Sequence, residues 1–120
     1  FRTLSTKATV LMKMNRLQEA KRVMEEALPY GNVTDLHYYA RTLVNMKQAE
    51  EAFKIFKLNY EKYPNLFTTN VGMGRGYAAM GDYKKALTYM KAALPQAPDD
   101  GNKTHVAGMI KRLEERQDVN

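Results

Sequence analysis

The chain has 120 residues, of which 44% are hydrophobic and 27% are charged, and its formal charge at neutral pH is +6. This composition is typical of one globular domain, the absence of cysteine excludes disulfides and thiolate chemistry, and no apolar run is long enough to span a membrane. The positive charge favours acidic partners, but the lysines and arginines are too dispersed to predict nucleic-acid binding.

Apolar residues spaced three and four apart recur along the whole chain, which predicts a series of amphipathic helices. In chain order, we expect helices at residues 2–14, 17–28, 34–46, 49–62, 68–80, 83–95 and 102–117. Asn15 and Gly81 suit the left-handed residue that ends a helix, while Thr68 or Thr69 and Asn102 are candidate caps for the fifth and seventh helices. The predicted fold class is therefore all-α, with about three-quarters of the residues in helices and no sheet.

The second helix of each predicted pair carries the same pattern of small and large residues. Ala20, Ala52 and Ala86 lie 32 and 34 residues apart, and each is followed four residues later by a large apolar side chain. A helix–turn–helix unit repeated at this interval is typical of a stacked array. We expect repeats at about 1–32, 33–66 and 67–100 within a single domain, and a final capping helix. Its apolar stripe is Val106, Met109, Ile110 and Leu113, with Lys111, Arg112, Glu114, Glu115 and Arg116 facing away.

The third repeat resembles a tetratricopeptide repeat. The residues that match the family pattern are Gly74, Tyr77, Gly81, Tyr83, Ala86, Met90, Ala93 and Pro98. The resemblance covers residues 1 to about 100, departs from the pattern at Lys7 and Asn59, and implies a right-handed α-solenoid. The last third of the chain also resembles, more faintly, the C-terminal repeat region of an uncharacterised bacterial family. That second resemblance implies an exported or periplasmic protein with another domain upstream; without it, the cytoplasm is the expected compartment.

Four glycines fall within Asn70–Tyr83, and one arrangement, Gly74-x-Gly76-x-x-Ala79, fits a loose dinucleotide-binding motif. That motif needs a preceding strand, and none is predicted here, so we place the glycines inside a helix. Gly74 then takes the small-residue position at which paired helices approach. Gly72 and Gly76 are not explained by the repeat, and they predict a close approach by a neighbouring helix or by a ligand backbone.

Residues suited to catalysis are scarce. His37 and His105 are the only candidates for a general base at neutral pH, and we expect them to lie far apart because they belong to different repeats. No familiar catalytic or metal-binding motif is present. The sequence predicts a protein that is not an enzyme and that uses neither a cofactor nor a metal ion.

The family resemblance also implies a concave groove lined by the first helix of each repeat. The groove positions of the family fall on Arg2, Thr9, Lys13, His37, Tyr38, Arg41, Asn45, Val71, Gly72 and Arg75. None of these is acidic, and Arg41 and Arg75 hold matching places in successive repeats. We expect both arginines to point out of the core on a face without carboxylates, where they either bind carboxylates of a partner or pair with carbonyl groups and Tyr38.

The known tetratricopeptide clamp on a C-terminal carboxylate is not matched. The corresponding positions hold Ser5, Thr9, Tyr38, Thr68 and Gly72, where that clamp uses lysine, asparagine and arginine. The leading hypothesis is a non-enzymatic scaffold that binds an acidic protein or peptide segment in its groove. In the alternative, the repeats pack against an upstream domain of the same chain or against another copy. The chain begins within a helical pattern and is expected to be a fragment. In a third hypothesis, the parent protein is an enzyme or a sugar- or envelope-associated factor whose active part lies outside these residues.

Overall fold

The structure is a computed structural model that describes residues 1–120. Helices are its only regular secondary structure, and they include 79% of the residues. The seven α-helices are α1 (Arg2–Lys13), α2 (Leu17–Ala27), α3 (Val33–Asn45), α4 (Ala49–Lys62), α5 (Phe67–Ala79), α6 (Tyr83–Ala93) and α7 (Asp100–Glu114). Two short 3-10 helices, η1 (Leu28–Tyr30) and η2 (Leu94–Gln96), extend α2 and α6. The predicted all-α class is confirmed, and the predicted helix limits differ from these by at most three residues.

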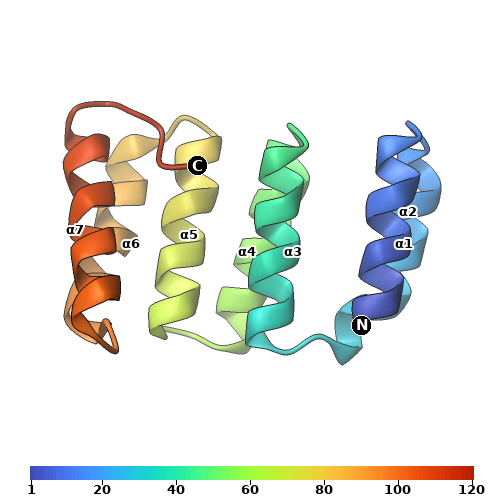
Figure 1. Ribbon diagram of the computed structural model, residues 1–120, viewed down its shortest axis with the longest axis horizontal. Coiled ribbons are helices and arrows are strands. Elements are labelled where there is room, and N and C mark those ends of the chain that lie inside the picture. The colour runs from blue at the N-terminus through green and yellow to red at the C-terminus, as the bar shows by residue number, and fades with distance from the viewer.

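The helices form adjacent pairs that are stacked in a row 38 Å long (Figure 1). In the view of Figure 1, α1, α3, α5 and α7 lie in the front layer, and α2, α4 and α6 lie behind them. This arrangement is that of a helical solenoid, as predicted. Its front layer supplies one continuous face of the molecule, on which side chains from different pairs are brought together.

The paired helices are joined by turns that contain a left-handed residue. Asn15 and Gly81 have φ angles of 61° and 82°, as expected, and Lys47 takes the same place between α3 and α4 with a φ of 63°. Each of these residues ends a helix and reverses the chain. A further left-handed residue, Arg116, follows α7 with a φ of 58°.

The two cap predictions were wrong. Asp99, not Asn102, caps α7, because the extended backbone lies at Asp99 and its Oδ1 accepts a hydrogen bond of 2.8 Å from the backbone N–H of Asn102. At the start of α5, neither Thr68 nor Thr69 is the cap. Leu66 occupies that position, and its backbone N–H donates to the Oγ1 of Thr69 at 3.1 Å.

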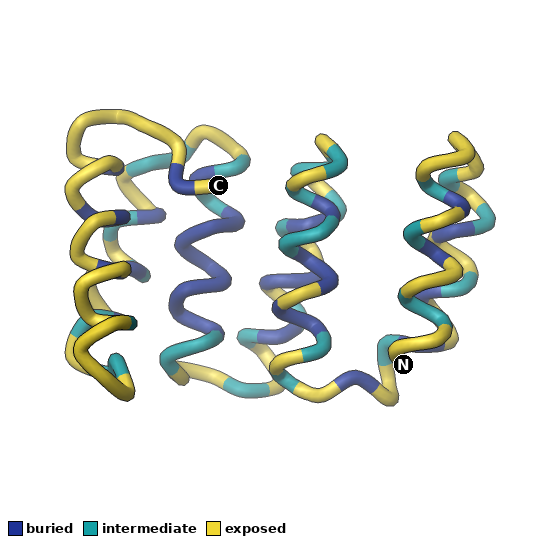
Figure 2. The backbone as a smooth tube through the Cα atoms, viewed as in Figure 1, coloured by how far each residue is buried: buried dark blue, intermediate teal, exposed yellow.

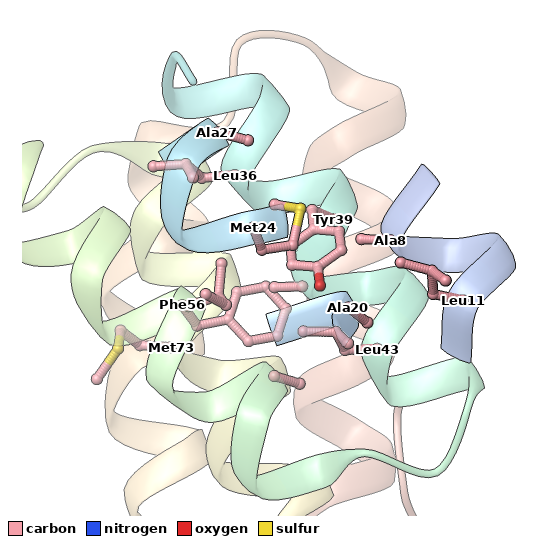
Figure 3. Close-up of a cluster of buried hydrophobic side chains, with 13 residues drawn as sticks. Ala8, Leu11, Ala20, Met24, Ala27, Leu36, Tyr39, Leu43, Phe56 and Met73 are labelled. Carbon is pink, nitrogen blue, oxygen red and sulfur yellow. The ribbon is translucent and has the colours of Figure 1, made fainter. Parts of the chain in front are cut away.

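Two clusters of apolar side chains form the core. The first joins the first two pairs and reaches α5, with Phe56 and Leu43 each 1% exposed (Figure 3). The second joins α5, α6 and α7. The predicted stripe of α7 is confirmed, because Val106, Met109, Ile110 and Leu113 are all buried whereas Lys111 to Gln117 are exposed apart from Leu113. The last helix therefore covers the apolar side of α6.

Close helix packing explains the glycines of α5, which is buried along most of its length (Figure 2). A Cβ atom at Gly72 would lie 2.8 Å from a ring carbon of Phe56, and one at Gly76 would lie 3.1 Å from the same ring and 3.2 Å from Phe53. Gly74 faces Met90 at 2.7 Å in the opposite direction. A neighbouring helix, rather than a ligand, therefore accounts for Gly72 and Gly76.

Replacing Gly72 with alanine is expected to lower the free energy of unfolding by about 1–2 kcal/mol. The new methyl group would press on Phe56, and overpacking costs more than the roughly 1 kcal/mol by which alanine favours a helix over glycine. Gly108→Ala is the matched control, because nothing lies within 4 Å of its missing Cβ atom, and it should raise stability by about 1 kcal/mol. Urea unfolding measures both; a gain in both variants would mean that α4 and α5 have room between them.

Candidate functional site

Charged and polar side chains gather in a hollow between α3, α5 and α7. This basic hollow has a volume of about 330 Å³. It brings together five of the ten residues that the sequence predicted for the groove, namely His37, Tyr38, Arg41, Val71 and Arg75. Phe67 and Val106 add apolar lining. The hollow thus combines two guanidinium groups with aromatic and aliphatic walls.

The other predicted residues lie elsewhere. Arg2, Thr9 and Lys13 line a hollow between α1 and α3, which Tyr38 also touches. Asn45 lies in a third hollow of about 360 Å³ at the C-terminal ends of α3 and α5. Gly72 is buried against Phe56 and contributes packing.

The expectation of a face without carboxylates was wrong. Asp35 lines the hollow between α1 and α3, and Asp118 lines the third hollow. Asp118 was missed because it follows the last predicted helix and has no place in the repeat. The basic hollow itself has no acidic residue in its lining.

Arg75 is buried, with 6% of its surface exposed, so the expectation that it points out of the core was also wrong. One terminal nitrogen, Nη1, donates to the carbonyl oxygen of Val119 at 3.2 Å, and the other, Nη2, lies 3.4 Å from the Nε2 of His105. Its Nε has no hydrogen-bond partner. Residues 115–120, called the tail below, fold back over α5 and cover Arg75 with the contacts of Val119 and Asn120 (Figure 1).

The charge of the basic hollow is not neutralised by salt bridges. The salt bridges of the structure join Arg16 to Glu19, and Glu51 to Lys21 and Lys54. None of them includes Arg41 or Arg75. Burial, followed by the positive charges of Arg41 and Arg112, lowers the pKa of Arg75 to about 10, against a smaller opposing effect of Asp118. An incoming carboxylate would relieve this repulsion, so the hollow favours an anionic group.

Both histidines lie near Arg75, although they belong to different repeats. Burial, followed by the charges of Arg75 and Arg41, lowers the pKa of His37 to about 4. The ring of His37 packs edge-on against that of Phe56, with centroids 5.6 Å apart. The pKa of His105 is lowered as well, by burial first and then by Arg75, Arg112 and Arg41. His37 is therefore neutral at neutral pH and lines the hollow with an uncharged ring.

The pKa of His37 predicts a loss of stability in mild acid. The folded-state pKa lies below the usual value of 6.5, so the unfolded chain binds the proton more readily and stability falls as the pH drops from about 6.5 towards 4. Between about pH 7.5 and pH 5 the His37 share amounts to roughly 2 kcal/mol. Urea unfolding of the wild type and of His37→Gln at both pH values isolates this share. Equal pH dependence of the two proteins would contradict the burial of a neutral histidine.

Several residues of the site carried no signal in the sequence. Arg112, Asp118, Val119 and Asn120 belong to the end of α7 or to the tail, where the repeat pattern has stopped. His105 was seen only as an isolated histidine. Arg112 is exposed, as expected, but its charge also acts on Arg75 and His105, which the repeat pattern does not reveal.

The structure has neither a membrane-spanning helix nor a metal-binding cluster. No helix has both the length and the apolar character needed to cross a membrane. No three side chains of histidine, cysteine, aspartate or glutamate lie close enough together to hold a metal ion.

Comparison with known proteins identifies one relationship. A protein-family model described as the tetratricopeptide repeat matches residues 1–28 and 69–100, together half of the chain. The chain matches no curated protein and no solved structure. The matched residues cover the α1–α2 and α5–α6 pairs, and the unmatched middle pair contains the departure from the pattern at Asn59. This asparagine is 1% exposed and donates from Nδ2 to the carbonyl oxygen of Val33 at 2.9 Å.

Proposed function

Since the chain belongs to the tetratricopeptide repeat family, whose members generally mediate protein–protein interaction without being enzymes, we propose that it is a scaffold that binds an acidic segment of a partner protein in the basic hollow. One observation carries the proposal: Arg41 and Arg75, from successive pairs, converge on one hollow and neither has an acidic partner. The segment supplies the missing carboxylates.

The chemistry of the hollow suits a peptide carboxylate. A guanidinium group presents its N–H donors in a planar fork that matches the two oxygens of a carboxylate, and such charge-assisted hydrogen bonds contribute about 1.5–3 kcal/mol each. Arg41 is partly buried and Arg75 is buried, so solvent screens them less than ordinary surface arginines. Tyr38 is 59% exposed beside them and offers an aromatic surface to the rest of the segment.

The test is the affinity of the chain for a glutamate-rich peptide, measured by fluorescence anisotropy. The double variant Arg41→Ala/Arg75→Met should bind at least about tenfold more weakly than the wild type, the equivalent of 1.4 kcal/mol. Added salt should also weaken binding, because exposed charges are screened over about 10 Å. The control is Arg22→Ala/Lys84→Ala, which removes two charges from exposed sites on α2 and α6. Equal losses of affinity in the two double variants would mean that net charge alone explains the effect.

The alternative, a structural module without a separate ligand, draws on a different feature. Val10 and Met14, in the first pair, are 50% and 58% exposed. In this alternative they pack against an upstream domain or against another copy. Sedimentation of the chain at rising concentration tests self-association, and Val10→Lys/Met14→Lys should abolish it if the first pair forms the contact. If the chain stays monomeric at all concentrations, packing of the first pair against another copy is excluded.

A further inference from the structure

The tail lies beside the basic hollow and contacts Arg75, one of the residues that line it. After Arg116, whose left-handed backbone turns the chain, the tail runs without helical structure across the end of α5 (Figure 1). Val119 is 6% exposed and belongs to the apolar cluster of α5, α6 and α7. Its carbonyl oxygen accepts from Arg75, and the side chain of Asn120 donates from Nδ2 to the backbone oxygen of Arg75 at 3.0 Å. One apolar anchor and two hydrogen bonds therefore hold the tail to α5.

The contacts of the tail leave the cationic groups of the site unsatisfied. The only acceptor that the tail offers to the Arg75 side chain is a neutral carbonyl oxygen, and the Nε of Arg75 has no partner. The tail has two side-chain carboxylates: that of Glu115 is exposed, and that of Asp118 accepts hydrogen bonds at 2.8–3.2 Å from the backbone N–H groups of Val119 and Asn120 and from the Asn120 side chain. A carboxylate placed on Arg75 would make a stronger bond than this carbonyl does.

We propose that the tail is an internal ligand and that the partner is a protein segment that replaces it. The inference rests on the proposed function and names its ligand more closely: an extended segment with a β-branched apolar residue for the Val119 position and a neighbouring acidic side chain that reaches Arg75 and Arg41. The tail reduces the affinity for this segment, because the fraction of molecules with an open site sets the apparent dissociation constant.

The inference is tested by releasing the tail from α5. The variant Val119→Ser/Asn120→Ala removes the apolar anchor and the side-chain hydrogen bond, and Gln117→Ala, at an exposed position of the tail, is the control. Two probes are titrated into each protein by anisotropy: the glutamate-rich peptide, and an acetylated and amidated peptide with the sequence of residues 115–120. The released variant should bind both probes at least about fivefold more tightly than the wild type and the control do. A probe with serine in place of its valine should bind more weakly.

The outcomes separate this inference from the proposed function. Equal affinities of the wild type and the released variant for the glutamate-rich peptide would overturn the inference and leave the proposed function standing. Absence of binding to either probe in every protein would reject both. A second measurement does not depend on the fold of a variant: in the wild type, the glutamate-rich peptide should move the amide resonances of Val119 and Asn120 towards unfolded positions. Binding without that movement would also overturn the inference.

Discussion

Removal of residues 101–120 is expected to lower the free energy of unfolding by several kcal/mol. Five apolar side chains would be lost from the core, namely Val106, Met109, Ile110, Leu113 and Val119, and each buried side chain of this size contributes about 1.5–3 kcal/mol. The apolar side of α6 would also be left open to solvent. A graded form of the experiment is Met109→Ala, at a position with no exposed surface, for which a loss of about 2–5 kcal/mol is expected. Urea unfolding measures both changes.

The control lies on the other side of the same helix. Lys111 is exposed, so Lys111→Ala should change stability by no more than about 0.5 kcal/mol. If the truncated chain unfolds at the same urea concentration as the full chain, α7 is an appendage and the second apolar cluster does not depend on it.

Replacing Arg75 with methionine is expected to raise stability and to weaken binding at the same time. The lowered pKa of Arg75 reports that burial and two nearby arginines disfavour its charged form. Methionine fills a similar volume without that penalty, so the free energy of unfolding should rise by about 1–2 kcal/mol, even though the bond to Val119 is lost. Affinity for the glutamate-rich peptide should fall about tenfold. A buried charge that costs stability but serves binding is the usual signature of a functional site.

Arg41→Met provides the comparison, because Arg41 lines the same hollow but is only partly buried and makes no side-chain hydrogen bond to another residue. It should lose a similar amount of affinity with little change in stability. A fall in stability of more than about 1 kcal/mol in Arg75→Met would show instead that the arginine is a structural link between α5 and the tail.

The helices could be predicted from the sequence because their signals are local. Alanines at a fixed interval and apolar residues three and four apart determine which face of each helix is buried, and left-handed residues such as Gly81 mark the ends. The glycines of α5 were more ambiguous. The sequence indicated that something approaches Gly72 and Gly76 closely, but only the packing of Phe53 and Phe56 identifies it.

The burial of Arg75 could not be predicted, because it depends on a contact across 44 residues. The tail is polar, has no helical period and contains a single apolar anchor, Val119, so nothing in the sequence indicates that it packs against α5. Its return to α5 follows from the turn at Arg116 and from the burial of Val119 in the apolar cluster of α5, α6 and α7. Arg41 and Arg75, which hold matching repeat positions, line one hollow, but the repeat pattern did not reveal that Arg75 is buried.

The central claim is that an acidic segment binds at Arg41 and Arg75, and it is tested most directly by the arginine Nε–Hε resonances during a titration with the glutamate-rich peptide. We expect the signals of Arg41 and Arg75 to move together, with a single dissociation constant, while those of Arg16, in the turn before α2, and Arg22, on α2, remain unchanged. Unchanged signals of Arg41 and Arg75, with movement of backbone amide resonances confined to the crevice of about 310 Å³ between α2 and α4, near Met24 and Ile55, would contradict the claim and place the binding surface on the other side of the solenoid.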